Sequence, residues 1–197
     1  MVFEVKNIAL TGTIGSGKTL ICSVFERLGV PVFVADKEAI KCYKDKTFLS
    51  EIATEFGNKI LENGQLNKKA LANIVFTDNK KLEKLNSMVH PRVLEMYNLW
   101  QESQKAPYTI MESAIVLEIG WGKKFDKIIT VDSPKKISIE RAMKRDNLSY
   151  DEIEERMNNQ FSNEEKIKRA DYIIHHDNKT MLLPQILEIN NQIITKK

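Results

Sequence analysis

The sequence lacks the features that mark membrane-spanning, exported and zinc-bound proteins. Its 197 residues contain no apolar stretch near the roughly 20 residues that a membrane helix needs. Its N-terminus lacks the basic and then apolar pattern of a signal peptide. Its two cysteines, Cys22 and Cys42, have no metal spacing, and its three histidines form no zinc set with them. We therefore expect a cytoplasmic protein with no membrane partner.

A strong excess of one charge is also missing. The 30 lysines and arginines nearly balance 27 acidic residues, and no basic motif with interleaved aromatics occurs. The content of 42% hydrophobic and 29% charged residues is ordinary for a globular domain. The length fits one domain, residues 1–197, with room for insertions. These features predict no nucleic-acid partner and a monomer or small homo-oligomer.

The most informative segment is residues 12–19, Gly-Thr-Ile-Gly-Ser-Gly-Lys-Thr, a complete G-x-x-x-x-G-K-[ST] phosphate loop. Its glycines allow tight turns that bring backbone N–H groups close to a polyphosphate. The lysine can reach the β- and γ-phosphates, and the threonine hydroxyl can bind Mg²⁺. The alternative is a glycine-rich turn without a ligand. The predicted nucleotide-binding residues are Gly12, Thr13, Ile14, Gly15, Ser16, Gly17, Lys18 and Thr19.

The flanks of this loop favour the phosphate-binding interpretation. Residues Asn7–Thr11 form a short apolar run, as expected of a buried parallel strand. Residues Lys18–Leu28 have helical spacing of their apolar positions and stop before Gly29. The loop would therefore lie at a helix N-terminus, where free amides and the helix dipole favour an anion.

Strands and helices alternate along the rest of the chain, which predicts an α/β fold with a five-stranded parallel sheet covered on both faces. The predicted strands are Asn7–Thr11, Val32–Ala35, Tyr108–Met111, Lys127–Val131 and Asp171–His175. The predicted helices of this core are Lys18–Leu28, Pro134–Arg145, Ser149–Asn159 and Leu182–Ile194.

The interval between the second and third strands is too long for one crossover. We predict a helical insertion over about residues 43–105 that shapes the acceptor site. Its expected helices are Phe48–Phe56, Lys68–Phe76, Asn79–Met88 and Pro91–Gln104.

Asp36 is the candidate catalytic carboxylate. It ends the predicted second strand, so a parallel sheet would place it on the same edge as the phosphate loop. There it could accept a proton from an attacking hydroxyl or help to hold Mg²⁺. The alternative is an N-cap on a helix that starts at Lys37.

Pairs of polar residues four positions apart mark the helices that follow the fourth strand. Arg141 and Arg145 share a helix face and could clamp phosphates or stack on a base. Arg156 and Gln160 have the same spacing and could face the phosphates. In both cases an ordinary solvated face is the alternative. Residues Ser149–Glu152 have the pattern of a capping box.

Three further residues have both a functional and a structural interpretation. His90 precedes Pro91 at an expected helix boundary and could donate to a substrate phosphate, or it could be a structural histidine. Glu118 follows an apolar run and could reach the substrate or end the element. Asn178 lies past the fifth strand, near a possible adenine position, or serves only as a turn residue.

Taken together, these residues resemble the dephospho-CoA kinase family over most of the chain, from about Ile8 to Asn178. The resemblance runs through the phosphate loop, the segment from Leu28 to Val32 leading to Asp36, and a series of later pieces. These are Phe56-Gly57, Leu66, Leu71, Ile74–Phe76, Leu85-Asn86, His90-Pro91, Glu118, Asp132, Arg141–Asp146, Gln160–Ser162, Glu165-Lys166 and Ala170–Ile174. The loop is shared by many families, whereas the order of the later pieces is much more specific.

The resemblance implies a nucleoside-monophosphate-kinase-like, three-layer P-loop kinase fold with a lid over about residues 141–168. It implies that MgATP phosphorylates the ribose 3′-hydroxyl of dephospho-CoA, giving CoA and ADP. Asp36, Lys18 and Arg141 would be catalytic. Substrate contacts are expected from Asp36, His90, Glu118 and Gln160, nucleotide contacts from the loop, Arg141 and Asn178, and a metal contact from Thr19.

The chain departs from the family pattern at three places. Members often have Asp-Ala-Asp where this chain has Val34-Ala35-Asp36, and an arginine where it has Ile40. The stretch Pro-Leu-Leu-Phe-Glu is Ala114-Ile-Val-Leu-Glu118 here, which keeps the glutamate and loses the proline. These changes concern the acceptor side more than the ATP site.

Three other functions compete with this interpretation. A kinase of the same fold could use another acceptor, such as a nucleoside or nucleotide. A GTP-dependent switch would need Asn-Lys-x-Asp, and the pairs Asn67-Lys68 and Asn79-Lys80 lack the aspartate. A nucleotide-binding regulatory module without catalysis has only the missing carboxylate at Val34 in its favour.

Overall fold

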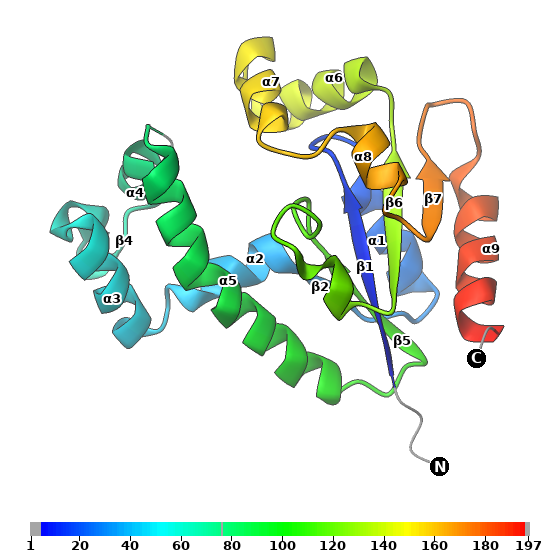
Figure 1. Ribbon diagram of the computed structural model, residues 1–197, viewed down its shortest axis with the longest axis horizontal. Helices are drawn as coiled ribbons and strands as arrows, with labels where there is room; N and C mark the ends of the chain where they lie inside the picture. Colours follow the sequence, from blue (N-terminus) through cyan, green and yellow to red (C-terminus); the bar gives the residue numbers. More distant parts are fainter. Residues whose placement is uncertain (1–4, 76, 196–197) are drawn as a thin grey trace. The chain divides into compact units, whose positions relative to one another are not determined.

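The computed structural model describes residues 5–75 and 77–195 (Figure 1). Contacts between Cα atoms divide the chain into two compact units. The first unit, called here the core unit, runs up to Phe33 and resumes at Ser103. The second, the helical unit, is Val34–Glu102. The part of the chain described contains no helix long and apolar enough to cross a membrane.

A five-stranded sheet in the order β2-β5-β1-β6-β7 forms the centre of the core unit. The ladders that join β5, β1, β6 and β7 are parallel. The predicted parallel sheet is therefore confirmed, and each strand lies within about one residue of its expected bounds. The strands are β2 (Val32–Val34), β5 (Tyr108–Glu112), β1 (Lys6–Gly12), β6 (Lys127–Asp132) and β7 (Tyr172–His175).

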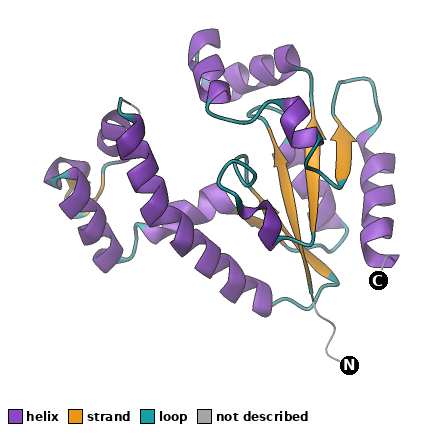
Figure 2. Ribbon diagram, viewed as in Figure 1, coloured by secondary structure: helices purple, strands orange, loops and turns teal. Residues whose placement is uncertain are grey.

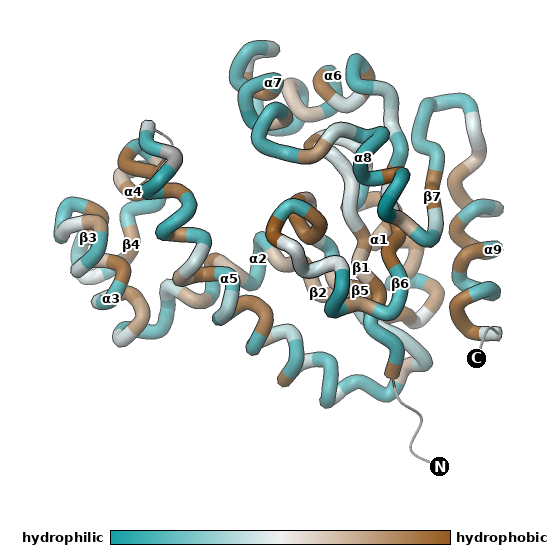
Figure 3. Tube along the Cα trace, viewed as in Figure 1, coloured by the Kyte–Doolittle hydropathy of each residue, from teal (hydrophilic) through white to brown (hydrophobic). Residues whose placement is uncertain are grey.

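Two helices bury the apolar positions of one sheet face. These helices are α1 (Lys18–Arg27) and α9 (Leu182–Thr195), which contact each other. Along α9, hydrophobic and hydrophilic residues alternate, as expected for a helix with one buried side (Figure 3). The core under the two helices is fully buried and includes Ile8, Leu10, Ile21, Phe25, Ile129, Val131 and Ile186.

The other sheet face is reached by α8 (Asn163–Ile167), which contacts β1 and β6. Since Leu10 points toward α1, its neighbour Thr11 points toward this second face. The capping box that the sequence predicts at Ser149 is present at the start of α7 (Tyr150–Asn158). A second one, Ser162 with Glu165, starts α8. The remaining elements of the core unit are α6 (Lys135–Asp146) and the 3-10 helix η2 (Trp121–Lys124).

The helical unit is built mainly from helices, with one short antiparallel hairpin (Figure 2). Its α2 packs on α5, and α4 also contacts α5. The elements are α2 (Ala35–Cys42), α3 (Lys46–Phe56), η1 (Asn58–Ile60), β3 (Leu61–Glu62), β4 (Gln65–Leu66), α4 (Lys68–Val75) and α5 (Asn79–Glu102). The predicted end of α4 at Phe76 lies outside the described residues.

The helix boundary predicted at His90-Pro91 is wrong. A single helix, α5, continues through Pro91. The proline removes one backbone N–H donor and would ordinarily break or kink a helix. Here, however, the buried residues Leu85, Val89, Val93 and Tyr97 recur every four positions on both sides of Pro91. Burial of this apolar stripe stabilises the continuous helix by more than the proline destabilises it.

The position of Asp36 also differs from the prediction. Strand β2 ends at Val34 and α2 begins at Ala35, so Asp36 lies in the first turn of α2 and is exposed. The N-cap is Val34, which rules out the alternative that Asp36 caps a helix starting at Lys37. A carboxylate in a first helical turn is favoured by the helix dipole.

Candidate active site

The phosphate loop lies between the end of β1 at Gly12 and the start of α1 at Lys18, as the sequence predicts. Gly15 and Gly17 have φ angles of +75° and +102°, a region that other residues rarely adopt. Both also lie in crowded surroundings. A Cβ atom on Gly15 would lie 1.9 Å from the backbone oxygen of Ser138, and one on Gly17 would lie 2.2 Å from Nδ1 of His176. Two glycines of the motif are thus required by conformation and by space.

Lys18 turns back over the loop. Its Nζ donates to the backbone oxygens of Gly12 and Thr13 at 3.0 and 3.2 Å. Carbonyl oxygens are acceptors like the phosphate oxygens that this lysine would bind. The hydroxyl-bearing Thr19 follows it and is exposed. The arrangement therefore keeps an ammonium group and a hydroxyl at the N-terminus of α1.

Glu112 is a site residue that the sequence reasoning missed. It is the last residue of β5 and pairs with Leu10 of β1 in the sheet register. Its Oε1 lies 3.9 Å from Lys18 Nζ, and both side chains are largely buried. A carboxylate directly after the apolar run Tyr108–Met111 is the signal that could have identified it.

Arg141 and Asn178, both predicted nucleotide contacts, meet beside the phosphate loop. Arg141 Nη2 donates to the side-chain oxygen of Asn178, and Nη1 donates to Ser16 O and Ser133 Oγ, each at 3.4 Å. Burial lowers the pKa of the Arg141 guanidinium from its usual value. The arginine remains charged in any case, because a guanidinium group is not deprotonated in proteins. The structure thus brings a cation from α6 to the loop that follows β7.

His176 is a second residue that the sequence reasoning missed. Its Nδ1 lies 2.8 Å from Ser16 O and 3.0 Å from Nη1 of Arg141. One nitrogen cannot donate to the carbonyl and accept from the guanidinium at the same time, so the tautomer selects one of these bonds. In either state the imidazole ring lies against Gly17 and joins the end of β7 to the phosphate loop.

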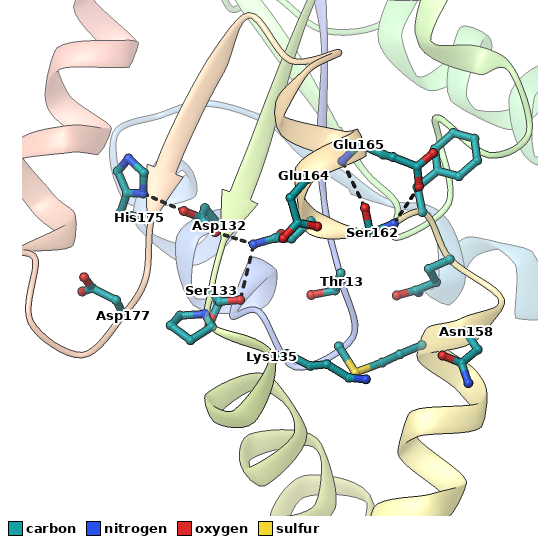
Figure 4. Close-up of a pocket in the computed structure, with 15 residues that line it drawn as sticks. Thr13, Asp132, Ser133, Lys135, Asn158, Ser162, Glu164, Glu165, His175 and Asp177 are labelled. Atoms are coloured by element: carbon teal, nitrogen blue, oxygen red, sulfur yellow. Dashed lines mark hydrogen bonds and ion pairs between the residues drawn. The ribbon is translucent and has the colours of Figure 1, made fainter.

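A cavity of about 650 Å³ opens beside Thr13 (Figure 4). Asp132 stands at the end of β6 and binds His175 Nδ1 at 2.8 Å through one oxygen, and Asn163 through the other. The wall includes Ser133, Lys135, Asn158, Gln160, Phe161, Ser162, Glu164, Glu165 and Asp177. This cavity has a mixed polar and apolar lining and lies on the carboxyl side of three strands, where ligands bind in open α/β sheets.

Glu118 and Gln160, predicted as substrate contacts, bind protein atoms in this structure. Glu118 Oε1 accepts from Lys166 Nζ at 2.5 Å and from the Phe161 amide at 2.8 Å. Gln160 Oε1 accepts from the Ile14 amide at 2.9 Å. Burial lowers the pKa of Lys166, and its hydrogen bond to Glu118 opposes this effect.

The other predicted substrate contacts, Asp36 and His90, belong to the helical unit. Asp36 is exposed on the first turn of α2. His90 lies in the middle of α5, is partly buried, and has its pKa lowered by that burial. A neutral imidazole is therefore favoured at His90 near neutral pH.

The fold and the loop define the class of the protein. A phosphate loop between a central parallel strand and a helix, with a lysine at its end and an arginine from a following helix beside it, is the arrangement of P-loop kinases. Within this class the family profile described as dephospho-CoA kinase matches residues 6–181. The chain belongs to the dephospho-CoA kinase family.

Individual relatives agree with this assignment. A dephospho-CoA kinase of Bacteroides fragilis is 38% identical over 184 residues, covering 92% of this chain and 90% of the relative. A solved structure from Thermus thermophilus is similar with a TM-score of 0.85 at 28% identity, covering 98% of both chains. The structure of dephospho-CoA kinase from Campylobacter jejuni gives a TM-score of 0.67 at 28% identity, covering 95% of this chain and 96% of that one.

Proposed function

We propose that this site transfers the γ-phosphoryl group of MgATP to the ribose 3′-hydroxyl of dephospho-CoA. The ribose 3′-oxygen forms a bond to the γ-phosphorus while the bond from that phosphorus to the β,γ-bridging oxygen breaks. ADP leaves, and the hydroxyl proton passes to a base on the protein and then to solvent. The reaction completes the synthesis of CoA, and it fits the family to which the chain belongs.

The observation that carries this proposal is the position of Lys18 in the loop. Its ammonium group binds two loop carbonyls and lies beside the buried carboxylate of Glu112. Phosphoryl transfer needs mainly positioning and charge neutralisation. Lys18 and the N-terminus of α1 would neutralise the β- and γ-phosphates, and Arg141 would add a second cation.

The residues beside Lys18 fit a bound Mg²⁺. This ion prefers oxygen ligands and usually takes one or two protein groups together with phosphates and water. Thr19 offers a hydroxyl and Glu112 a carboxylate, and no group of three potential metal ligands gathers among residues 5–75 and 77–195. When bound, the ion would neutralise charge on the β- and γ-phosphate oxygens.

Asp36 is the proposed base or hydroxyl-orienting group. It is the second residue of α2, directly after β2, and its carboxylate is exposed. A carboxylate in this position can accept the proton of an attacking hydroxyl. His90, which is favoured as a neutral imidazole, would donate a hydrogen bond to the acceptor.

The residues 141–168 are the proposed lid, and residues 43–105 the proposed acceptor-binding insertion. A lid that excludes water would limit hydrolysis of ATP before the acceptor is bound. We propose that the protein acts in the cytoplasm on these two small-molecule substrates, as a monomer or small homo-oligomer.

The test is to incubate the pure protein with MgATP and dephospho-CoA while following ADP release and the mass of CoA. CoA should form only in the complete mixture, and Lys18→Ala should remove most of the activity. A parallel panel of nucleosides and nucleotides tests the acceptor. Transfer to one of these instead of dephospho-CoA would contradict the proposed substrate and keep the kinase class.

A further inference from the structure

The phosphate loop has a support that originates at the end of α7. The geometry points to Gln160 as a positioning residue that holds the Ile14 amide, with Glu118 and Lys166 fixing the segment that carries it. This assignment rests on the proposed function of the loop as the ATP phosphate site. It places Gln160 on the nucleotide side of the reaction, as its spacing from Arg156 allowed, whereas the family resemblance implied a contact with the substrate.

Ile14 is the loop residue through which this support acts. Its backbone N–H donates to Oε1 of Gln160 at 2.9 Å, a bond between residues 146 positions apart. Its side chain packs against a buried cluster of Ile139, Ala142 and Ile153 from α6 and α7. Both the amide and the side chain of one loop residue are therefore held by the segment between β6 and β7.

The adjacent glycine shows how closely this segment approaches. A Cβ atom on Gly15 would lie 1.9 Å from the backbone oxygen of Ser138 on α6, and 3.2 Å from Cβ of Ala142. Further along the loop, Ser16 N donates to Thr13 O at 3.1 Å, and Ser16 O is contacted by Arg141 on α6 and by His176 after β7. The outer part of the loop thus depends on α6, α7 and the residue after them for its shape.

The segment that carries Gln160 is held by the buried ion pair between Glu118 and Lys166. The Phe161 amide donates to Glu118 Oε1 at 2.8 Å, and Lys166 Nζ donates to the same oxygen at 2.5 Å and to Ala114 O at 2.8 Å. The guanidinium carbon of Arg169 lies 4.2 Å from the centre of the Phe161 ring. These contacts fix the backbone immediately after Gln160.

Burial of Lys166 and Glu118 keeps the segment after Gln160 in one position. Lys166 is fully buried, so the segment cannot leave Glu118 without stranding a charge in the protein interior. Glu118 Oε2 is buried as well and has no hydrogen-bond partner. Since Oε1 already accepts two hydrogen bonds and Oε2 is buried, the carboxylate is held by the protein interior.

An amide side chain suits the place that Gln160 occupies. Its oxygen accepts the Ile14 N–H without adding a negative charge beside a triphosphate site. Small errors of position are costly in group transfer, since a shift of about 1 Å can reduce a rate on the order of a hundredfold. A neutral acceptor that fixes one loop amide therefore acts on nucleotide binding and on the placement of the γ-phosphate.

The experiment compares Gln160→Met, which keeps the length and removes the acceptor, with the natural protein. Affinity for a non-hydrolysable MgATP analogue, measured by calorimetry without acceptor, should fall by about five- to tenfold, the effect of one lost hydrogen bond. Amide exchange of a peptide that contains Ile14 should become faster. KM for dephospho-CoA should stay unchanged.

Asn159→Met is the matched control, because Asn159 is exposed and its side chain donates to the Glu155 carbonyl one turn back. It should behave like the natural protein in every readout. A rise in KM for dephospho-CoA with unchanged nucleotide affinity, or unchanged exchange at Ile14, would overturn the assignment. If the natural protein binds the nucleotide analogue but forms no CoA, the proposed function is overturned. The nucleotide-affinity and amide-exchange measurements on Gln160→Met can still be interpreted in that case.

The ion pair is tested with the double variant Glu118→Leu and Lys166→Met. Glu118→Gln alone leaves Lys166 as an unpaired buried charge and should lower the melting temperature sharply. The double variant removes both charges, so it should recover much of that stability. Exchange at Ile14 should nevertheless be faster in the double variant. Protection of Ile14 equal to that of the natural protein would show that the ion pair does not support the loop.

Discussion

Lys18 Nζ, at the start of α1, and Glu112 Oε1, at the end of β5, lie 3.9 Å apart. Their side chains are only 11% and 7% exposed, so the interaction is screened little by solvent. A carboxylate so close to the lysine that we propose as the phosphate ligand would repel a triphosphate unless a cation accompanied it. We therefore propose that Glu112 supports the metal ion that would accompany ATP.

The first prediction concerns Glu112→Gln. Neutralising the carboxylate should lower the affinity of the site for Mg²⁺. Loss of such a partner typically costs about 10- to 100-fold in metal affinity. We expect at least a tenfold higher Mg²⁺ concentration at half-maximal CoA formation. Glu188→Gln on α9, an exposed residue, is the control and should leave the Mg²⁺ dependence unchanged. An identical Mg²⁺ titration for both variants would rule out a metal role for Glu112.

The second prediction concerns Asp36→Asn. The amide cannot take the proton of the acceptor hydroxyl, and loss of general-base catalysis typically costs about 100- to 10,000-fold in rate. We expect kcat for CoA formation to fall in that range while affinity for the MgATP analogue stays within about twofold of the natural value. Equal loss of nucleotide affinity and turnover would indicate a structural or metal-binding role for Asp36 instead.

The sequence predicted the sheet and the phosphate loop because their signals are local. The apolar run Asn7–Thr11, the glycines of the loop and the helical spacing after Lys18 each lie within a few residues. The same locality made Pro91 misleading. Its effect on a helix is local, whereas the stripe of buried residues on α5 that opposes it extends over several turns.

The contacts of the candidate site that the sequence could not predict join residues that are far apart in the chain. His176 meets Ser16 across 160 positions, and Gln160 meets Ile14 across 146. Nothing in the neighbourhood of either residue indicates its partner, because the contacts arise only when β6, β7 and β1 lie side by side. Glu112 is different, since the apolar strand before it is visible in the sequence and the predicted strand stopped one residue short.

The third prediction compares Gly15→Ala with Gly29→Ala. Both glycines have positive φ, +75° and +83°, so each alanine would carry a similar backbone strain of about 1 to 2 kcal/mol. Only Gly15 is crowded, because a Cβ there would lie 1.9 Å from Ser138 O, whereas nothing lies within 4 Å at Gly29. Overpacking should cost a further 1 to 3 kcal/mol or so.

Urea unfolding measures this difference directly. Gly29→Ala should lower the free energy of unfolding through backbone strain alone. Gly15→Ala should lower it through the same strain and through the clash with α6. We expect the free energy of unfolding to be lower for Gly15→Ala by the overpacking cost, and ATP-analogue affinity to fall only in that variant. Equal free energies for the two variants would mean that α6 can move away from the loop without cost.

The fourth prediction concerns Asp177, which forms the turn that presents Asn178 to Arg141. Its carboxylate accepts the N–H groups of Thr180 and Lys179 at 2.8 and 2.9 Å, together with the Thr180 hydroxyl. These bonds lower the pKa of Asp177 from 3.8 to about 2, with the Thr180 amide as the largest cause. Because the folded pKa is depressed, the carboxylate stabilises the folded protein fully above pH 3.8 and loses this effect as the pH falls toward 2.

Asp177→Asn should remove this pH dependence, since an amide accepts hydrogen bonds but does not titrate. Urea unfolding between pH 4 and pH 2 should then show a shallower loss of stability than in the natural protein. Asp151→Asn, an exposed carboxylate on α7, controls for the general effect of removing one charge. A direct NMR titration of the Asp177 carboxyl carbon gives the same answer independently. A midpoint near 3.8 would mean that the turn does not hold the carboxylate in solution, and Asn178 would then lose the support that places it beside Arg141.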